Sequence, residues 1–169
     1  MNIVKYVALF IVLVLFQIFI GKNLIIMGTA FCFIYVLFLL MLPVENGVVS
    51  SLLLGFLIGV LIDMVYNTGG MHSAASVLVM FFRSRWLNAI TPQGGYDAGT
   101  YPSLHVGGMT WFIGYAWPVI FIHHLIIFFL ESYGFSFFWH TLNKALMSSI
   151  FTITLAVLFL TLFGKIKSR

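Results

Sequence analysis

Charged residues are scarce in this chain. Only 7% of its 169 residues are Asp, Glu, Lys or Arg, whereas 62% are hydrophobic, and the mean hydropathy is +1.13. A soluble domain of this size keeps a large polar exterior, which this composition cannot supply. The composition therefore excludes a soluble globular protein and predicts an integral membrane protein with a single transmembrane domain, residues 1–169.

Cysteine is nearly absent as well, because Cys32 is the only one. An intramolecular disulfide is therefore excluded. The formal net charge of +4 comes from basic residues at the ends of apolar runs rather than from a patch with polar loops between its members. Such a distribution sets orientation in a membrane and argues against nucleic-acid binding.

Motifs of enzymes are also missing: the sequence has no Walker loop, dinucleotide fingerprint or zinc quartet. One short stretch, YPSLH at 101–105, resembles the PSxH signature of the membrane phosphatidic-acid phosphatase superfamily, with Ser103 and His105 in the matching positions. That chemistry also needs basic phosphate ligands upstream and a second His with an acid downstream. No Lys lies between 23 and 143, and no Asp follows Asp97. We therefore expect no enzymatic activity and no cofactor, and a membrane phosphatase that uses Ser103 and His105 is the least favoured alternative.

What the chain does have is a series of long apolar runs. Because about 20 helical residues cross the hydrocarbon core, the runs predict an all-α bundle of about six transmembrane helices, near 3–20, 24–42, 48–66, 71–90, 110–130 and 145–163. The fourth is apolar only to Phe82. It either continues to Ile90 with Arg83 and Arg85 snorkelling to the headgroups, or is re-entrant.

Two segments between the runs stand out by composition. Residues 91–106 are rich in Pro and Gly and predict a polar loop, whereas 133–142 are rich in aromatic residues and predict a segment in the membrane interface. With six spans and the N-terminus inside, six basic residues are inside (Lys5, Arg83, Arg85, Lys165, Lys167, Arg169) and two outside (Lys22, Lys144). The positive-inside rule thus favours cytoplasmic termini.

The third run carries small residues at four-residue spacing: Ser51, Gly55 and Gly59, followed by Asp63. These positions share one helix face, where a neighbouring helix can approach closely. A break with Asn67, Gly69 and Gly70 follows, and then His72 near the start of the next helix. We expect the Asp63 carboxylate to accept hydrogen bonds from that helix start. A proton or cation site is the alternative, because an acid inside a membrane is often functional.

A second polar group consists of His123, His124 and Glu131 near the end of the fifth run. His124 and Glu131 lie two helical turns apart and share a face. Metal binding would need a further ligand, and His140 is the only candidate nearby. Polar contacts between helices are the favoured interpretation, and no metal is expected.

The chain as a whole resembles the rod shape-determining protein MreD family. The resemblance lies in its size, in the central GFLIGVLIDMVYNTGGMHSAASVLVMFFR, and in the later TPQGGYD, IHHLIIFFLE and SFFWHTL segments, which are similar to Bacteroidota-type members. It implies a non-enzymatic scaffold of the cell-elongation complex in the bacterial plasma membrane, which helps to position peptidoglycan synthesis. Implied partners are an MreC-like protein and, with it, MreB and the RodA–penicillin-binding-protein synthase.

The same resemblance implies a fold similar to the substrate-binding subunits of energy-coupling-factor transporters. A vitamin-like binding subunit is therefore the alternative function, ranked lower because few polar groups converge in the sequence. We expect the loop residues Gly94, Gly95, Tyr96 and Asp97 to contact a soluble partner. A homo-oligomer is also possible.

Overall fold

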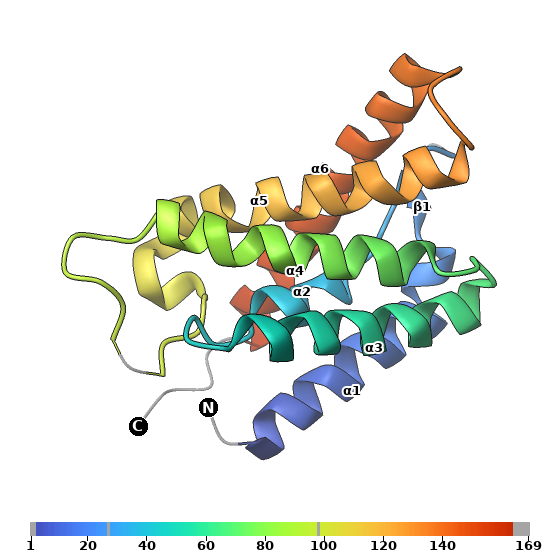
Figure 1. The fold of residues 1–169 in the computed structure, drawn as a ribbon. Helices are drawn as coiled ribbons and strands as arrows, with labels where there is room; N and C mark the ends of the chain where they lie inside the picture. Colours follow the sequence, from blue (N-terminus) through green and yellow to red (C-terminus); the bar gives the residue numbers. More distant parts are fainter. Residues whose placement is uncertain (1–2, 27, 98, 164–169) are drawn as a thin grey trace.

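The computed structural model describes residues 3–26, 28–97 and 99–163, and its architecture is helical (Figure 1). The long helices are α1 (Ile3–Phe19), α3 (Val48–Tyr66), α4 (Met71–Ala89), α5 (Leu104–Glu131) and α6 (Phe138–Phe163). Four of them, α1, α3, α5 and α6, are long and apolar enough to cross a membrane. The predicted helical fold class is thus confirmed, and the four apolar helices indicate a membrane protein.

Helix α4 is the fourth predicted run. It is one continuous helix of 19 residues, which corresponds to a length of about 28 Å. It packs against α3 on one side and α5 on the other, and α5 packs against α6 (Figure 1). Helices α1, α3 and α5 run in one direction and α4 and α6 in the other, so α1 begins and α6 ends at the same end of the bundle (Figure 1).

The prediction of a long helix over 24–42 is wrong. This stretch holds two short antiparallel strands, β1 (Ile25–Ile26) and β2 (Ala30–Phe31), and the five-residue helix α2 (Val36–Leu40). A 3-10 turn, η1 (Gly21–Asn23), leads into β1. Residues 32–42 are all buried inside the protein. The run is therefore apolar because it forms the centre of the core, and it does not form a lipid-facing helix.

Irregular backbone at membrane depth needs hydrogen-bond partners from the protein itself. Gln17 of α1 supplies two of them: its Nε2 donates to the carbonyl of Cys32 at 2.9 Å, and its Oε1 accepts from the N–H of Tyr35 at 3.4 Å. Helix α6 supplies two more. The Ser148 hydroxyl accepts from the N–H of Phe31 at 2.9 Å, and the Thr152 hydroxyl accepts from that of Phe33 at 3.2 Å.

The other end of this buried segment is held by Arg83 of α4, which contradicts the expectation that both arginines snorkel. Arg83 is only 1% exposed. Its Nη2 donates to the carbonyls of Leu40, at 3.4 Å, and Leu42, and its Nε donates to the Tyr115 hydroxyl at 2.7 Å. The last carbonyls of a helix lack partners within it, so Arg83 is needed inside at the end of α2. Arg85 is exposed, with its guanidinium over the ring of Phe81.

Helices α5 and α6 begin earlier than the apolar runs predict. Helix α5 begins at Leu104 and breaks at Gly108, whose φ of 76° lies in the left-handed region that glycine tolerates. Helix α6 begins at Phe138, so half of the predicted interface segment 133–142 is its first turn. Phe137 and Trp139 remain 70% and 78% exposed there, as expected for aromatic residues at a membrane interface.

The backbone contacts of residues 31–35 yield a first prediction. We expect Thr152→Val to lower the free energy of unfolding by about 1–3 kcal/mol, because the nearly isosteric side chain leaves the buried Phe33 N–H without its acceptor. Thermal unfolding of the detergent-solubilised protein, followed by size-exclusion fluorescence, measures the effect.

Thr154→Val is the matched control. Thr154 is exposed on the same helix and donates only to the carbonyl of Ile150, so its replacement should change stability by less than about 0.5 kcal/mol. Equal melting temperatures for the two variants would contradict a buried hydrogen bond at Thr152.

Candidate functional site

The small-residue face of α3 lies against α4 at backbone contact. A Cβ placed on Gly59 would lie 2.3 Å from Cα of Ser73, and one on Gly55 would lie 3.0 Å from the carbonyl oxygen of Ser76. Ser51 is buried on the same face, and its hydroxyl accepts from Nδ2 of Asn46 at 2.8 Å. The spacing that the sequence shows at these positions therefore corresponds to a close contact between two helix backbones.

The Asp63 carboxylate receives four hydrogen bonds. Oδ1 accepts from the Thr68 hydroxyl at 2.5 Å and from the N–H of His72 at 2.9 Å, and Oδ2 accepts from the N–H and hydroxyl of Ser73 at 2.9 and 2.5 Å. The expected hydrogen bonds from the start of α4 are thus present. They occupy about all the acceptor sites of a carboxylate, which favours the capping interpretation over a cation site.

The turn between α3 and α4 uses residues that tolerate left-handed backbone. Asn67 ends α3 with a φ of 56°, and Gly69 and Gly70 follow with φ of 59° and 102°. Asn and Gly accept such values more easily than other residues do. The turn brings His72 back to Asp63, and the predicted motif residues from Ser51 to His72 form one connected hairpin.

Behind this hairpin lies a buried polar group that the sequence reasoning missed. The hydroxyl of Tyr35 lies 3.0 Å from Nδ1 of His72 and 2.7 Å from Nε2 of His123, and all three side chains are buried. A phenol has one proton, so it donates to one ring and accepts from the other. Tyr35 was not expected here because the run 24–42 was predicted to be a regular transmembrane helix.

His123, His124 and Glu131 do not form one site. Nδ1 of His124 lies 2.7 Å from the carbonyl of Ile120, and its Nε2 lies 3.1 Å from the Thr152 hydroxyl, a contact between α5 and α6. Glu131 instead pairs with Lys144. Within the described part of the chain, no group of three or more His, Cys, Asp or Glu residues could hold a metal ion.

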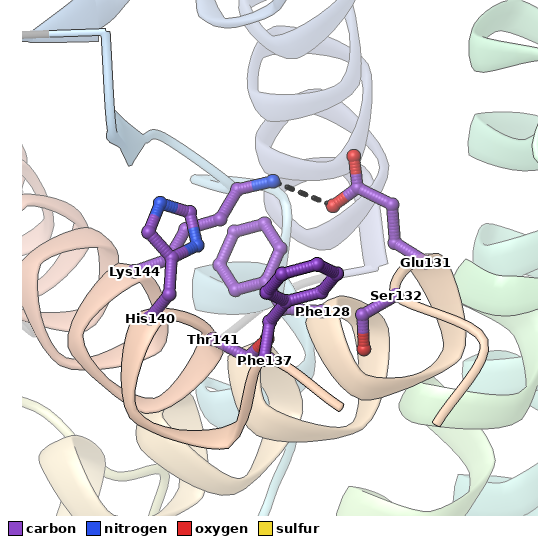
Figure 2. Close-up of a pocket in the computed structure, with 7 residues that line it drawn as sticks. All are labelled: Phe128, Glu131, Ser132, Phe137, His140, Thr141 and Lys144. Atoms are coloured by element: carbon purple, nitrogen blue, oxygen red, sulfur yellow. Dashed lines mark hydrogen bonds and ion pairs between the residues drawn. The ribbon is translucent and has the colours of Figure 1, made fainter. Parts of the chain in front are cut away.

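A cavity of about 500 Å³ opens where α5 ends and α6 begins (Figure 2). Nζ of Lys144 lies 2.6 Å from Oε2 of Glu131 and 4.4 Å from the ring centroid of Phe128. Sequence reasoning placed Glu131 with the histidines and gave Lys144 only a role in orientation. The pairing of these two side chains depends on how the end of α5 lies against the start of α6, which the sequence alone does not show. The lining residues are Phe128, Glu131, Ser132, Phe137, His140, Thr141 and Lys144.

The predicted contact loop joins α4 to α5 at the opposite end of the bundle (Figure 1). Gly94, Gly95 and Asp97 are exposed, whereas Tyr96 is half-buried with its ring edge-on to that of Trp111. The loop is anchored by a hydrogen bond from the N–H of Val44 to the carbonyl of Thr100, 2.9 Å long.

The phosphatase-like stretch lies where this loop meets α5. Ser103 is buried directly before the helix. The side chain of His105 lies outside the described part of the structure, as do Lys165, Lys167 and Arg169.

Comparisons of the chain with family models, with curated proteins and with solved structures give no significant match.

The backbone contact at Gly59 yields a second prediction. Gly59→Ala places a methyl group against the backbone of Ser73, so α3 and α4 must separate, and we expect a loss of about 1–3 kcal/mol in stability. Gly114→Ala is the control, because nothing lies within 4 Å of a Cβ at that position of α5. Alanine there should be neutral or stabilising by up to about 1 kcal/mol. Thermal unfolding of both variants in one detergent tests the difference. Equal losses of stability would show that the small-residue face of α3 is not in close contact with α4.

The hydrogen bonds to the Asp63 carboxylate yield a third prediction. Asp63→Asn keeps the size of the side chain but replaces one acceptor oxygen by an NH₂, which faces N–H donors of α4 and cannot accept from them. We therefore expect the free energy of unfolding to fall by about 1–3 kcal/mol. The exposed Asp97 offers the control, and Asp97→Asn should leave the melting temperature unchanged. An unchanged melting temperature for Asp63→Asn would rule out the capping role.

Proposed function

We propose that this chain is a non-enzymatic membrane scaffold of the MreD type, which helps to position peptidoglycan synthesis during cell elongation. The observation that supports the proposal is the structural role of the central motif, which joins α3 to α4. Gly55 and Gly59 bring two helix backbones together, and Asp63 has its acceptor sites filled by the start of α4. The residues that carry the resemblance thus build a rigid hairpin, as a scaffold requires.

The proposed location is the bacterial plasma membrane, with both chain termini in the cytoplasm. The distribution of basic residues supports this orientation, because Lys5, Arg83 and Arg85 lie toward one end of the bundle and Lys22 and Lys144 toward the other. The loop 91–103 is then cytoplasmic, and the cavity beside Lys144 faces the outside.

The proposed partner in the membrane is an MreC-like protein with one transmembrane helix. Through it, the scaffold would join MreB and the RodA–penicillin-binding-protein synthase. Helices associate in lipid by van der Waals packing and a few hydrogen bonds, so a preformed bundle with a rigid hairpin offers a fixed surface to such a helix. The exposed loop residues Gly94, Gly95 and Asp97 are the proposed contact for a soluble partner.

A native capture experiment tests this function. Tagged protein is isolated from gently solubilised native membranes, and its companions are identified by mass spectrometry. We expect an MreC-like protein together with elongation synthases. A transporter ATPase pair with its transmembrane coupling subunit would contradict the scaffold and identify a vitamin-binding subunit instead.

The loop contact is tested in the same capture by Asp97→Lys, which reverses an exposed charge and should leave the melting temperature unchanged. We expect the soluble, MreB-like companion to be reduced severalfold while the MreC-like protein is retained. Asn143→Lys, at an exposed position near the other end of the bundle, is the control. Full recovery of every companion with Asp97→Lys would remove the loop from the interface.

A further inference from the structure

The cavity between the end of α5 and the start of α6 carries two opposite charges at its rim. The side chain of Glu131 is 52% exposed, whereas that of Lys144 is 17% exposed and holds its ammonium over the rings of Phe31 and Phe128. An ammonium has three donors and a carboxylate about four acceptor sites. Their mutual hydrogen bond uses one of each, so both groups keep capacity for a ligand.

Two further polar groups face the same space. His140 and Thr141 line the cavity from the first turn of α6 (Figure 2). Thr141 is buried to 97%. Lys144 lies with these groups on the cavity wall, and Glu131 supplies the acceptor directly beside Lys144.

The formal charges of this lining sum to zero, and the positive Lys144 and the negative Glu131 lie side by side as an ion pair. An anionic ligand would leave its charge next to Glu131 uncompensated, and a cationic one would repel Lys144. A zwitterion with adjacent phosphate and ammonium groups can contact Lys144 with the phosphate and Glu131 with the ammonium. The chemistry of the lining thus selects a phosphoethanolamine-type group.

The position of the cavity indicates that the group belongs to a lipid. Helix α5 runs for 23 residues after the break at Gly108, about 35 Å, which exceeds the hydrocarbon thickness of about 30 Å. Its end at Glu131 therefore reaches the headgroup region. The exposed ring of Phe137, which lines the cavity, and that of Trp139 two residues later are typical of that level of a bilayer.

We propose that this cavity binds the headgroup of phosphatidylethanolamine. Lys144, His140 and the Thr141 hydroxyl would contact the phosphate, Glu131 would accept from the ammonium, and Phe137 would contact the glycerol region. The proposal does not depend on the scaffold function, because it rests on residues outside the central hairpin.

Native mass spectrometry of the full, detergent-solubilised protein tests it. The delipidated protein is titrated with dioleoyl phosphatidylethanolamine, phosphatidylcholine and phosphatidylglycerol. We expect the ethanolamine lipid to bind about tenfold more tightly than the other two, since choline cannot donate a hydrogen bond to Glu131 and glycerol brings no cation. Equal affinities for the three lipids would overturn the proposal.

Variants locate the site. Glu131→Gln should abolish the preference for ethanolamine over choline. Thr141→Val should lower the affinity for all three lipids severalfold, because the contact with the phosphate is lost. Glu45→Gln makes the same substitution at another exposed glutamate. It is the matched control, and its affinities for the three lipids should equal those of the wild type. Glutamine at position 131 can still accept a hydrogen bond from Lys144, so the variant should lose only a small part of its stability. A preference retained in Glu131→Gln would overturn the assignment.

Free phosphoethanolamine distinguishes a lipid from a water-soluble ligand. It lacks the glycerol and acyl groups, so a hundredfold excess should leave most of the lipid bound. Displacement at equal concentration would overturn the lipid assignment in favour of a soluble zwitterion.

Discussion

The structure depends on how the backbone of residues 32–42 satisfies its hydrogen bonds. This segment passes through the core with only five residues in a helix, so many of its N–H and C=O groups lack partners in regular secondary structure. Water is absent at this depth, and an unpaired backbone group there costs several kcal/mol. Side chains of the surrounding helices must therefore supply the missing donors and acceptors.

Four of the long helices each contribute at least one such side chain. Gln17 comes from α1, Arg83 from α4, Tyr115 from α5 and Thr152 from α6. These contacts explain why polar residues occur inside apolar runs. They also connect helices that are distant in sequence, because each one binds the same central segment. The buried segment is in this sense the common partner around which the bundle assembles.

Helix α3 is fixed in a different way. It has no such polar side chain for the central segment, and its place is set by backbone contact at Gly59 and by the Asp63 cap on α4. The two kinds of contact divide the molecule into a core held by side-chain hydrogen bonds and a hairpin held by close packing. A rigid body of this kind suits a protein whose proposed task is to position others.

Sequence patterns predicted some of this architecture and missed the rest for physical reasons. The bounds of α3 followed from an apolar run between Gly47 and Asn67, and the four-residue spacing up to Asp63 indicated the contact with α4. The run 24–42 was misread because lipid and a protein core select the same apolar residues. Gln17 and Thr152 were the available signals, since a polar side chain in an apolar helix needs an internal partner. The burial of Arg83 could not be predicted either, because an arginine near a helix end can snorkel to the headgroups or be buried against backbone carbonyls, and the sequence is the same in both cases.

The backbone conformation of residues 30–40 in a lipid bilayer tests this account most directly. Solid-state NMR of isotopically labelled protein reads it from the ¹³C shifts of Cα and Cβ, which differ between extended and helical residues because their φ and ψ differ. The account predicts extended shifts at Ala30 and Phe31 and helical shifts from Val36 to Leu40. Helical shifts throughout 24–42 would contradict it, because a regular transmembrane helix would need none of the side-chain partners described above.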